Sequence, residues 1–250
     1  MIDTKLVGGI AVVTLAYGKV NALDTEFCEA LAARFVELRS GDAKAVVLTG
    51  QGKAFSAGVD LIKLSEGGGD YIRAFLPSLH KLCETVFFHP KPVVAAINGH
   101  AIAGGAVLAC CADRRIMARG PGRIGVTELL VGLPFPSLAF EVVRATVPAR
   151  YLPEVTYSGA TYETDAALAR GWIDEIAEPD ELLEDALAVA QELAALSPAA
   201  FAHTKAQIRQ AAAEHYARSG SATDRAATDI WCAPASLAYI RAYVARTLKK

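Results

Sequence analysis

The sequence predicts an α/β fold that ends in an all-helical segment, and three observations support this. Strand-like and helix-like segments alternate from Ile10 to Ile176, which favours a right-handed α/β core. After Pro179 the patterns are helical throughout. The chain has 250 residues, of which 53% are apolar, so it can bury a sizeable core.

The first unit is predicted to be β-α-β. Ile10–Leu15 is a β-rich run, and Ala45–Thr49 is a short apolar run closed by Gly50, typical of a buried strand. Between them Thr25–Arg39 has helical spacing, with Thr25 as the expected N-cap. The apolar residues that recur on one face of this helix are Phe27, Leu31, Phe35 and Leu38.

The second unit repeats this alternation. A helix is expected over Tyr71–Phe88, and the prolines that follow it end the helical pattern. Val93–Ile97 reads as a strand, Gly104–Cys111 as a small-residue helix and Arg114–Ala118 as another strand. After Ala118 we expect a helix over Tyr162–Arg170 and a strand over Trp172–Ile176. These are followed by helices over Glu181–Leu196, Pro198–Tyr216 and Asp224–Leu248.

Composition excludes several classes of protein. The longest apolar stretch, Ala101–Ala112, is too short to span a bilayer, and residues 1–5 lack the features of a secretion signal, so we expect a cytoplasmic protein without membrane contact. A net charge of −2 with interspersed acids and bases disfavours nucleic-acid binding. Five cysteines and five histidines without metal-ligand spacing indicate reduced thiols and no metal site.

Two small-residue segments follow strands and could hold an anion. Gly52–Leu61 can present backbone N–H groups at a strand end, and Asp60 can cap a helix that begins near Leu61. Asn98–Ala106 places two adjacent glycines where a helix begins, which leaves N–H groups unpaired. The alternative interpretations are an ordinary strand-to-helix connection for the first and tight helix-on-sheet packing for the second.

A third segment, Ile124–Pro134, contains a candidate base. Glu128 lies among apolar residues, and the resulting desolvation would raise its pKa and suit it to proton transfer. The alternative is a first-turn glutamate favoured by the helix dipole, with Thr127 as the cap.

Taken together, the two anion-facing segments resemble the paired oxyanion-hole motifs of the crotonase (enoyl-CoA hydratase/isomerase) family. Lys19–Leu23 resembles the early CoA-binding loop of that family, and Lys91–Gly99 resembles the strand that leads to its second oxyanion donor. The resemblance covers nearly the whole chain. It implies a crotonase-type ββα spiral core over residues 1–195, with an α-helical C-terminal trimerisation segment over residues 196–250.

The resemblance also implies an acyl-CoA thioester as substrate, with coenzyme A as part of the substrate and no separate cofactor. The backbone N–H groups of Val59 and Gly104 would bind the thioester oxygen as it becomes an enolate, and Glu128 would move the proton. The residues implied in substrate binding are Lys19, Ala22, Ala57, Asp60 and Leu61.

One departure from the family pattern affects the expected reaction. The second catalytic glutamate of the family falls on Val107, and a valine can neither hold a water molecule nor exchange a proton. A single carboxylate is enough for a Δ3-to-Δ2 double-bond shift, so we expect an isomerase. The alternatives are an atypical enoyl-CoA hydratase and a non-catalytic acyl-CoA-binding protein.

Further expectations concern charged residues and assembly. Lys53, Lys63 and the terminal Arg246, Lys249 and Lys250 are candidates to reach the CoA phosphates, whereas Asp113 is expected to have a structural role. We expect a homotrimer or a dimer of trimers. A C-terminal helix would place apolar residues on one face, suited to a partner or to the same subunit, and these residues are Leu237, Ile240, Val244 and Leu248.

Overall fold

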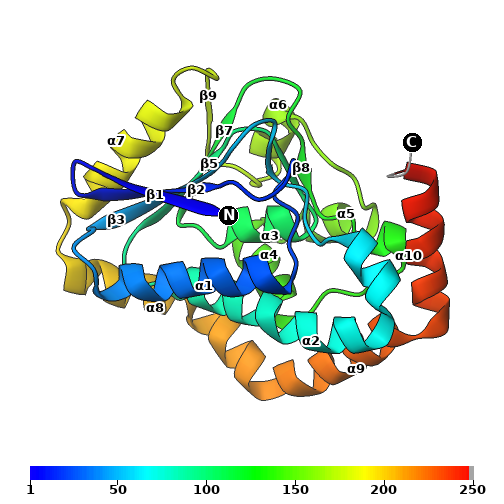
Figure 1. Cartoon of the computed structure of the whole chain (residues 1–250). Helices are drawn as coiled ribbons and strands as arrows, with labels where there is room; N and C mark the ends of the chain where they lie inside the picture. The colour runs from blue at the N-terminus through cyan, green and yellow to red at the C-terminus, as the bar shows by residue number, and fades with distance from the viewer. Residues whose placement is uncertain (248–250) are drawn as a thin grey trace.

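The structure is a computed structural model that describes residues 1–247, and its core is a six-stranded sheet (Figure 1). The strand order is β1-β2-β3-β5-β7-β9, with β1 antiparallel to β2 and the remaining pairs parallel. The strands of this sheet are β1 (Ile2–Val7), β2 (Ile10–Leu15), β3 (Ala45–Gly50), β5 (Val93–Ile97), β7 (Arg114–Ala118) and β9 (Glu175–Ala177). A smaller parallel sheet consists of β4 (Ala54–Ser56), β6 (His100–Ile102) and β8 (Ile124–Gly125).

Helices connect and cover these sheets. Those of the first 195 residues are α1 (Thr25–Ser40), α2 (Leu61–Phe87), α3 (Gly104–Cys110), the short 3-10 helix η1 (Glu128–Val131), α4 (Ser137–Thr146), α5 (Leu152–Tyr157), α6 (Thr164–Ala169) and α7 (Leu182–Ala194). The helices after residue 195 are α8 (Pro198–His215), the π-helical turn η2 (Tyr216–Gly220), α9 (Ser221–Cys232) and α10 (Pro234–Thr247).

Both faces of the main sheet are buried, which explains the apolar runs in its strands. On β3, Val46 and Leu48 face the core shared with α1 and α2, whereas Ala45 and Val47 face the cluster that α7 covers. Figure 1 shows α7 on one side of the sheet and α1 on the other. Alternate residues of each strand therefore bury in different layers.

The two sheets are linked by a repeating ββα unit. β3, β5 and β7 of the main sheet are each followed by a strand of the small sheet, namely β4, β6 and β8, and then by a helix. Each repeat thus advances the chain by one strand in both sheets. This is the ββα spiral that the family resemblance implied, and it brings the turns after β4, β6 and β8 to the same region.

Several predicted boundaries were wrong. α1 is capped by the Asp24 side chain, which accepts a bond from Phe27 N–H, so Thr25 is its first residue and not its cap. α2 joins the helix that Asp60 was expected to cap, beginning at Leu61, to the helix predicted from Tyr71, and the two meet at a kink at Gly68, whose φ of 60° and ψ of −152° are non-helical. The strand expected over Trp172–Ile176 is β9, displaced to Glu175–Ala177.

The predicted C-terminal helix is two helices. The chain leaves α9 at Ala233, which is extended, and α10 begins at Pro234, whose fixed φ suits a first helical position. Ile240 and Val244 are buried in the core of their own subunit, so this face of α10 is not free for a partner. Leu248, Lys249 and Lys250 lie outside the described residues.

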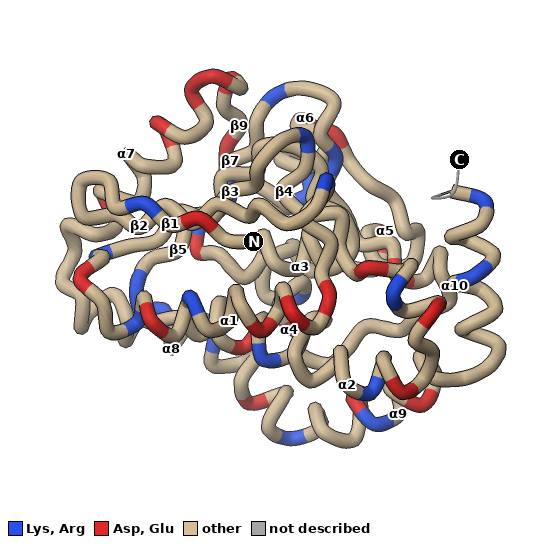
Figure 2. Tube along the Cα trace, in the orientation of Figure 1, with Lys and Arg blue, Asp and Glu red and all other residues tan. Residues whose placement is uncertain are grey.

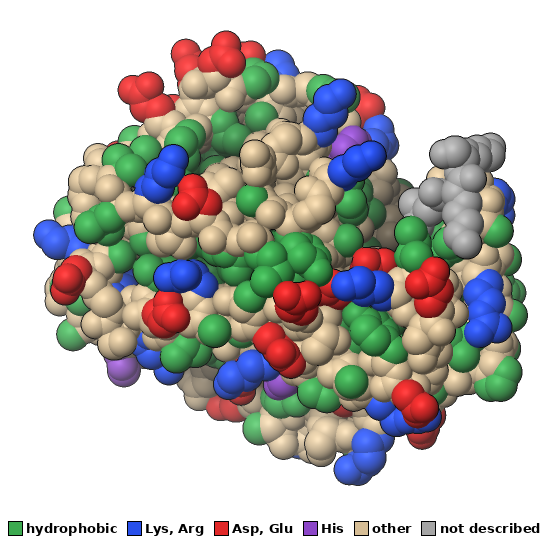
Figure 3. Space-filling model, in the orientation of Figure 1, with side chains coloured by type: hydrophobic (Ala, Val, Ile, Leu, Met, Phe, Trp, Pro, Cys, Tyr) green, Lys and Arg blue, Asp and Glu red, His purple; other side chains and the backbone are tan. Residues whose placement is uncertain are grey.

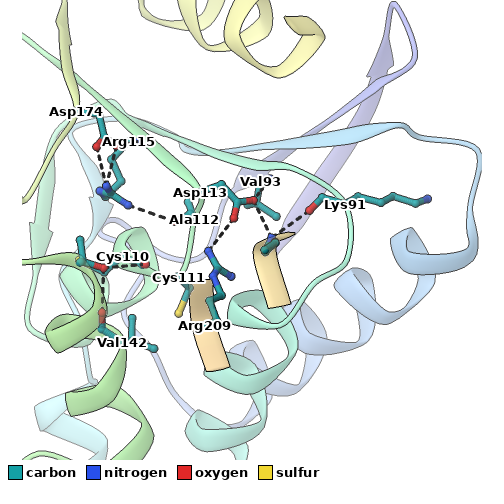
Figure 4. Close-up of polar contacts among 12 residues, drawn as sticks. Lys91, Val93, Cys110, Cys111, Ala112, Asp113, Arg115, Val142, Asp174 and Arg209 are labelled. Atoms are coloured by element: carbon teal, nitrogen blue, oxygen red, sulfur yellow. Dashed lines mark hydrogen bonds and ion pairs between the residues drawn. The ribbon is translucent and has the colours of Figure 1, made fainter. Parts of the chain in front are cut away.

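A buried charge cluster joins α8 to the core (Figure 4). Asp113, just before β7, accepts bonds from Lys205 Nζ at 2.7 Å, Arg209 Nη2 at 2.8 Å and the N–H of Val93 at 2.8 Å. Burial lowers the pKa of Lys205 to about 8, even though Asp113 favours its charged form. The predicted structural role of Asp113 is therefore confirmed, and the cluster anchors the C-terminal helices.

Charges elsewhere are mixed in sign. Lys and Arg are interspersed with Asp and Glu along the trace (Figure 2), and the face in Figure 3 shows both signs close together. The five cysteines form no disulfide in the structure. Among residues 1–247, every helix is too short or too polar to cross a lipid bilayer, and no three His, Cys, Asp or Glu side chains gather as metal ligands would.

Candidate active site

A cavity of about 670 Å³ lies where the turns after β4, β6 and β8 meet the C-terminal helices; we call it the reaction cavity. Its lining includes the predicted site residues Lys19, Ala22, Ala57, Val59, Asp60, Leu61 and Glu128. The predicted Gly104 lines a smaller space of about 20 Å³, the inner cavity, which shares Val59, Glu128 and Trp231 with the reaction cavity. The structure therefore brings all eight predicted residues into one region.

The backbone around Val59 leaves its N–H group unpaired. Leu23 N–H donates to Gly58 O at 2.7 Å, and Asp60 N–H donates to Leu23 O at 2.9 Å. In a parallel bridge of this kind, the residue between the two hydrogen-bonded peptides, here Val59, points its own N–H group away from the partner strand. Within residues 1–247 no group accepts a hydrogen bond from Val59 N–H. The N–H group of Val59 is therefore a free hydrogen-bond donor beside the reaction cavity.

Gly104 supplies a second free donor next to the first. It is the first residue of α3, a position without an intrahelical acceptor, and no described residue accepts its N–H. A Cβ atom at Gly58 would lie 3.0 Å from Gly104 N and 2.5 Å from Ile102 O, so only glycine allows this approach. Ala103, immediately before Gly104, has φ of 52°, a conformation that costs about 1–3 kcal/mol and is typical of functional sites.

The neighbouring Gly105 has a different purpose. A Cβ atom there would lie 2.2 Å from Ser56 O, so this glycine is required for packing of α3 against β4. The sequence left two interpretations of the glycine pair, an anion-facing turn and tight helix-on-sheet packing, and each applies to one of the two glycines. Gly105 satisfies tight packing, while Gly104 faces the inner cavity with its N–H unpaired.

Glu128 is a buried carboxyl group without a nearby cation. It opens η1 directly after β8, it is 9% exposed, and its Oε2 has no hydrogen-bond partner among the described residues. Burial raises its pKa to about 7, and the amide N–H groups of Glu128 itself and Thr127 oppose this by less. The Thr127 side chain makes no capping bond, so the alternative of a capped first-turn glutamate is not supported.

The surroundings of Glu128 are apolar. Val107, one turn into α3, lines the inner cavity together with Leu79, Cys83 and Ala139. Burial raises the pKa of the thiols in this core that show a shift, such as Cys110 to about 11, so they are protonated at neutral pH. Among the described residues that line the inner cavity, Glu128 is the single carboxyl group.

The loop before α1 is held in place by Asn21. Its side chain accepts a bond from Tyr17 N–H at 2.8 Å and donates to the carbonyls of Ala54 and Phe55 at 3.1 Å. Asn21 itself has φ of 51°, which asparagine tolerates better than most residues. These bonds fix Lys19 and Ala22 beside β4, where they form one edge of the reaction cavity.

The first turn of α2 forms a second edge. Asp60 caps α2 through bonds from Ile62 and Lys63 N–H, both at 3.0 Å, as the sequence predicted. Burial opposes ionisation of Asp24, but bonds from Lys63, Phe27 N–H and Tyr17 outweigh it and lower its pKa. Lys63 is therefore occupied by Asp24, and its expected reach to a phosphate competes with this ion pair.

Several residues that complete the reaction cavity carry no functional signal in the sequence. Tyr17, Val131 and Leu133 line it, as do Trp231 of α9 and Tyr243 of α10. Tyr17 donates to Asp24 Oδ2 at 2.7 Å, and Trp231 Nε1–H donates to Pro134 O at 2.8 Å. The local sequence around Trp231 and Tyr243 does not indicate a cavity, because the positions of these two residues depend on how α9 and α10 fold back onto α2.

Two adjacent backbone donors facing a desolvated carboxyl group, on a ββα spiral, define a site that can stabilise an oxyanion while moving a proton. The family model for enoyl-CoA hydratase/isomerase matches residues 6–230. A Thermus thermophilus protein provisionally named an enoyl-CoA hydratase is 37% identical over 74% of this chain and 74% of its own length. The chain therefore belongs to the enoyl-CoA hydratase/isomerase family.

Solved structures agree in fold and differ in the activity that they name. A Mycobacterium tuberculosis enoyl-CoA isomerase is 32% identical with a TM-score of 0.79, covering 96% of this chain and 97% of its own. In a second solved structure the same protein is described as a probable enoyl-CoA hydratase. The human mitochondrial delta3-delta2-enoyl-CoA isomerase has a TM-score of 0.92 over 100% of this chain and 98% of its own, and at 24% identity this likeness shows the fold alone.

Proposed function

We propose that the protein is an enzyme that acts on acyl-CoA thioesters and shifts the double bond of a 3-enoyl-CoA to the 2-position, with Glu128 as its single proton carrier. This proposal rests on one observation: the desolvated Glu128 carboxyl group lies in an inner cavity whose other side chains are mostly apolar. Glu128 faces the inner cavity, and the opposite position, Val107, offers no second carboxylate. One group that accepts and returns a proton is sufficient for isomerisation and insufficient for ordinary two-carboxylate hydration.

The proposed reaction needs no co-reactant. The Glu128 carboxylate removes a proton from C2 of the 3-enoyl thioester, and the electron pair of that C–H bond moves into a dienolate. Negative charge on the thioester oxygen is stabilised by the N–H groups of Val59 and Gly104, which are already oriented. The protonated Glu128 then returns the same proton to C4, and the double bond becomes C2=C3.

The remaining predicted residues would bind the coenzyme. We propose that Lys19, Ala22, Ala57, Asp60 and Leu61 hold the CoA part of the substrate, since they line the edges of the reaction cavity formed by the Asn21 loop and the first turn of α2. The C-terminal helices complete the cavity within the same chain through Trp231 and Tyr243.

Hydration is the second candidate function, favoured by the hydratase name of the Thermus relative. It would require another group to position and activate water. Besides Glu128, the described lining of the inner cavity consists of apolar side chains, Gly104 and Cys83, and it offers no second carboxylate and no imidazole.

A paired assay on 3-hexenoyl-CoA and 2-hexenoyl-CoA tests the proposal. We expect turnover of the first and negligible hydration of the second. Glu128→Gln should lower isomerisation by about 10²–10⁴-fold, the usual contribution of a general base, while hexanoyl-CoA binding persists. Glu141→Gln is a matched control, because Glu141 is a buried glutamate of α4 that pairs with Arg144 and His215.

The outcomes separate the candidate functions. If Glu128→Gln isomerises as fast as the wild type, the assignment of Glu128 is wrong. Efficient hydration by the wild type would support the hydratase instead. Acyl-CoA binding without turnover of either substrate would support a non-catalytic binder.

We also propose that the protein assembles as a homotrimer or a dimer of trimers. Exposed apolar side chains near η1, namely Leu129, Leu130 and Tyr239, are available for such contacts. A solution mass of three or six times 26.4 kDa by light scattering would support the proposal, and a monomer would contradict it.

A further inference from the structure

Trp231 closes the inner end of the reaction cavity. It lines both the reaction cavity and the inner cavity, and it is 1% exposed. The hydrogen bond from Nε1–H to Pro134 O, at 2.8 Å, fixes the orientation of the indole ring. The ring therefore forms a rigid wall beside Glu128 and not a mobile cover.

A third space lies next to the inner cavity. The outer groove, of about 510 Å³, is lined by Leu76, Pro77 and His80 of α2, by Ala227 and Thr228 of α9, and by Pro136, and its lining also includes the charged residues Arg73, Asp224, Arg225 and Asp229. Pro136 also lines the inner cavity, so the two spaces are neighbours.

The same elements carry the lining of both spaces. Along α2, Leu76 and His80 face the outer groove, and Leu79 and Cys83, three residues further on, face the inner cavity. Along α9, Ala227 and Thr228 face the groove, and Trp231 faces the cavity. Residues three apart are separated by about one helical turn, so along both helices the outer groove adjoins the inner cavity, and Trp231, Leu79 and Pro136 form the wall of the inner cavity on that side.

We infer that Trp231 is a specificity-determining residue that restricts the protein to acyl-CoA thioesters with short acyl chains. This inference rests on the proposed function. Val59 and Glu128 border both the reaction cavity and the inner cavity, and Gly104 borders the inner cavity, so the carbons next to the thioester lie where the reaction cavity meets the inner cavity. Its 20 Å³ is close to the space that one water molecule requires, about 10–15 Å³. An acyl chain that points past Glu128 towards α2 and α9 can therefore continue only if the Trp231 wall opens into the outer groove.

The test measures chain-length preference in the full-length protein and its variants. Isomerisation of 3-hexenoyl-CoA and 3-dodecenoyl-CoA gives one ratio of kcat/KM, and binding of hexanoyl-CoA and dodecanoyl-CoA gives a second ratio that does not depend on the reaction. The wild type should prefer the short thioester by at least about tenfold, since one misfitting methylene changes specificity by roughly 10–200-fold. Trp231→Ala should shift both ratios towards the long chain by at least about tenfold.

Control variants keep the test decisive. Trp231→Leu removes the indole with a smaller loss of packing, and it should shift the ratios in the same direction if Trp231→Ala does not fold. Trp172→Phe changes the second tryptophan, which is fully buried and lines none of the three spaces, and it should leave the ratios as in the wild type.

The outcomes distinguish this inference from the proposed function. Equal use of short and long thioesters by the wild type, or unchanged ratios in folded Trp231 variants, would overturn the role of Trp231 and leave the isomerase intact. If the wild type isomerises neither substrate, the proposed function fails, and the binding ratios alone decide whether Trp231 limits chain length.

Discussion

Replacing Glu128 with glutamine should stabilise the folded protein in alkaline solution and change its stability little in acid. Burial raises the pKa of Glu128 from 4.5 to about 7, so the folded protein keeps this proton over a pH range in which the unfolded chain has lost it. Wild-type stability therefore decreases as pH rises from 4.5 through 7, and the loss is complete above pH 7. A glutamine at this position carries no proton to lose.

The size of the effect follows from the two pKa values. They differ by about 2.5, and each pKa unit corresponds to about 1.4 kcal/mol, so the difference in unfolding free energy is about 3 kcal/mol. For a chain of this size, 1 kcal/mol shifts the melting temperature by about 2–4 °C, which gives about 6–12 °C as the maximum.

Thermal unfolding of both proteins at pH 5 and pH 9 measures this effect. Other ionisable groups, including Lys205, are present in both proteins and cancel in the difference. The variant should melt well above the wild type at pH 9 and close to it at pH 5. An equal difference at the two pH values would refute the reasoning, because it would mean that the Glu128 carboxylate is solvated in the folded protein.

Three further predictions concern the reaction and the core. Because Glu128 must be ionised to remove a proton, kcat/KM for 3-hexenoyl-CoA should rise with pH through about 7 and then level off; a flat profile from pH 5 to 9 would contradict its role as base. Val107→Glu should raise hydration of 2-hexenoyl-CoA by at least about tenfold, since a second carboxylate supplies the missing acid–base group, and Val107→Leu is the control that should give no gain. Asp113→Ala should lower the free energy of unfolding in urea by about 3–5 kcal/mol, because it leaves two buried cations without their carboxylate; Asp165→Ala, which breaks the exposed ion pair with Arg119, should have a far smaller effect, and equal effects would argue against the cluster as an anchor.

Much of the chemistry was predictable because it depends on local backbone. Small residues directly after a strand leave N–H groups unpaired, and this placed Val59 and Gly104 beside each other once the ββα spiral formed. The buried strands were readable because both faces of the main sheet are covered. The small sheet was missed, since strands of two or three residues such as β8 carry no measurable periodicity.

The sequence by itself determined the fold class, since short-range patterns specify strands, turns and helix starts, and its resemblance to the family indicated the two oxyanion segments and the candidate base. Tertiary structure decided the environment of that base. Glu128 is desolvated because Val107 of α3, Leu79 of α2 and Trp231 of α9 converge on it from distant parts of the chain. Its pKa depends on the water excluded by all three, and no local pattern encodes their meeting. The same convergence positions Trp231 as the wall between the inner cavity and the outer groove.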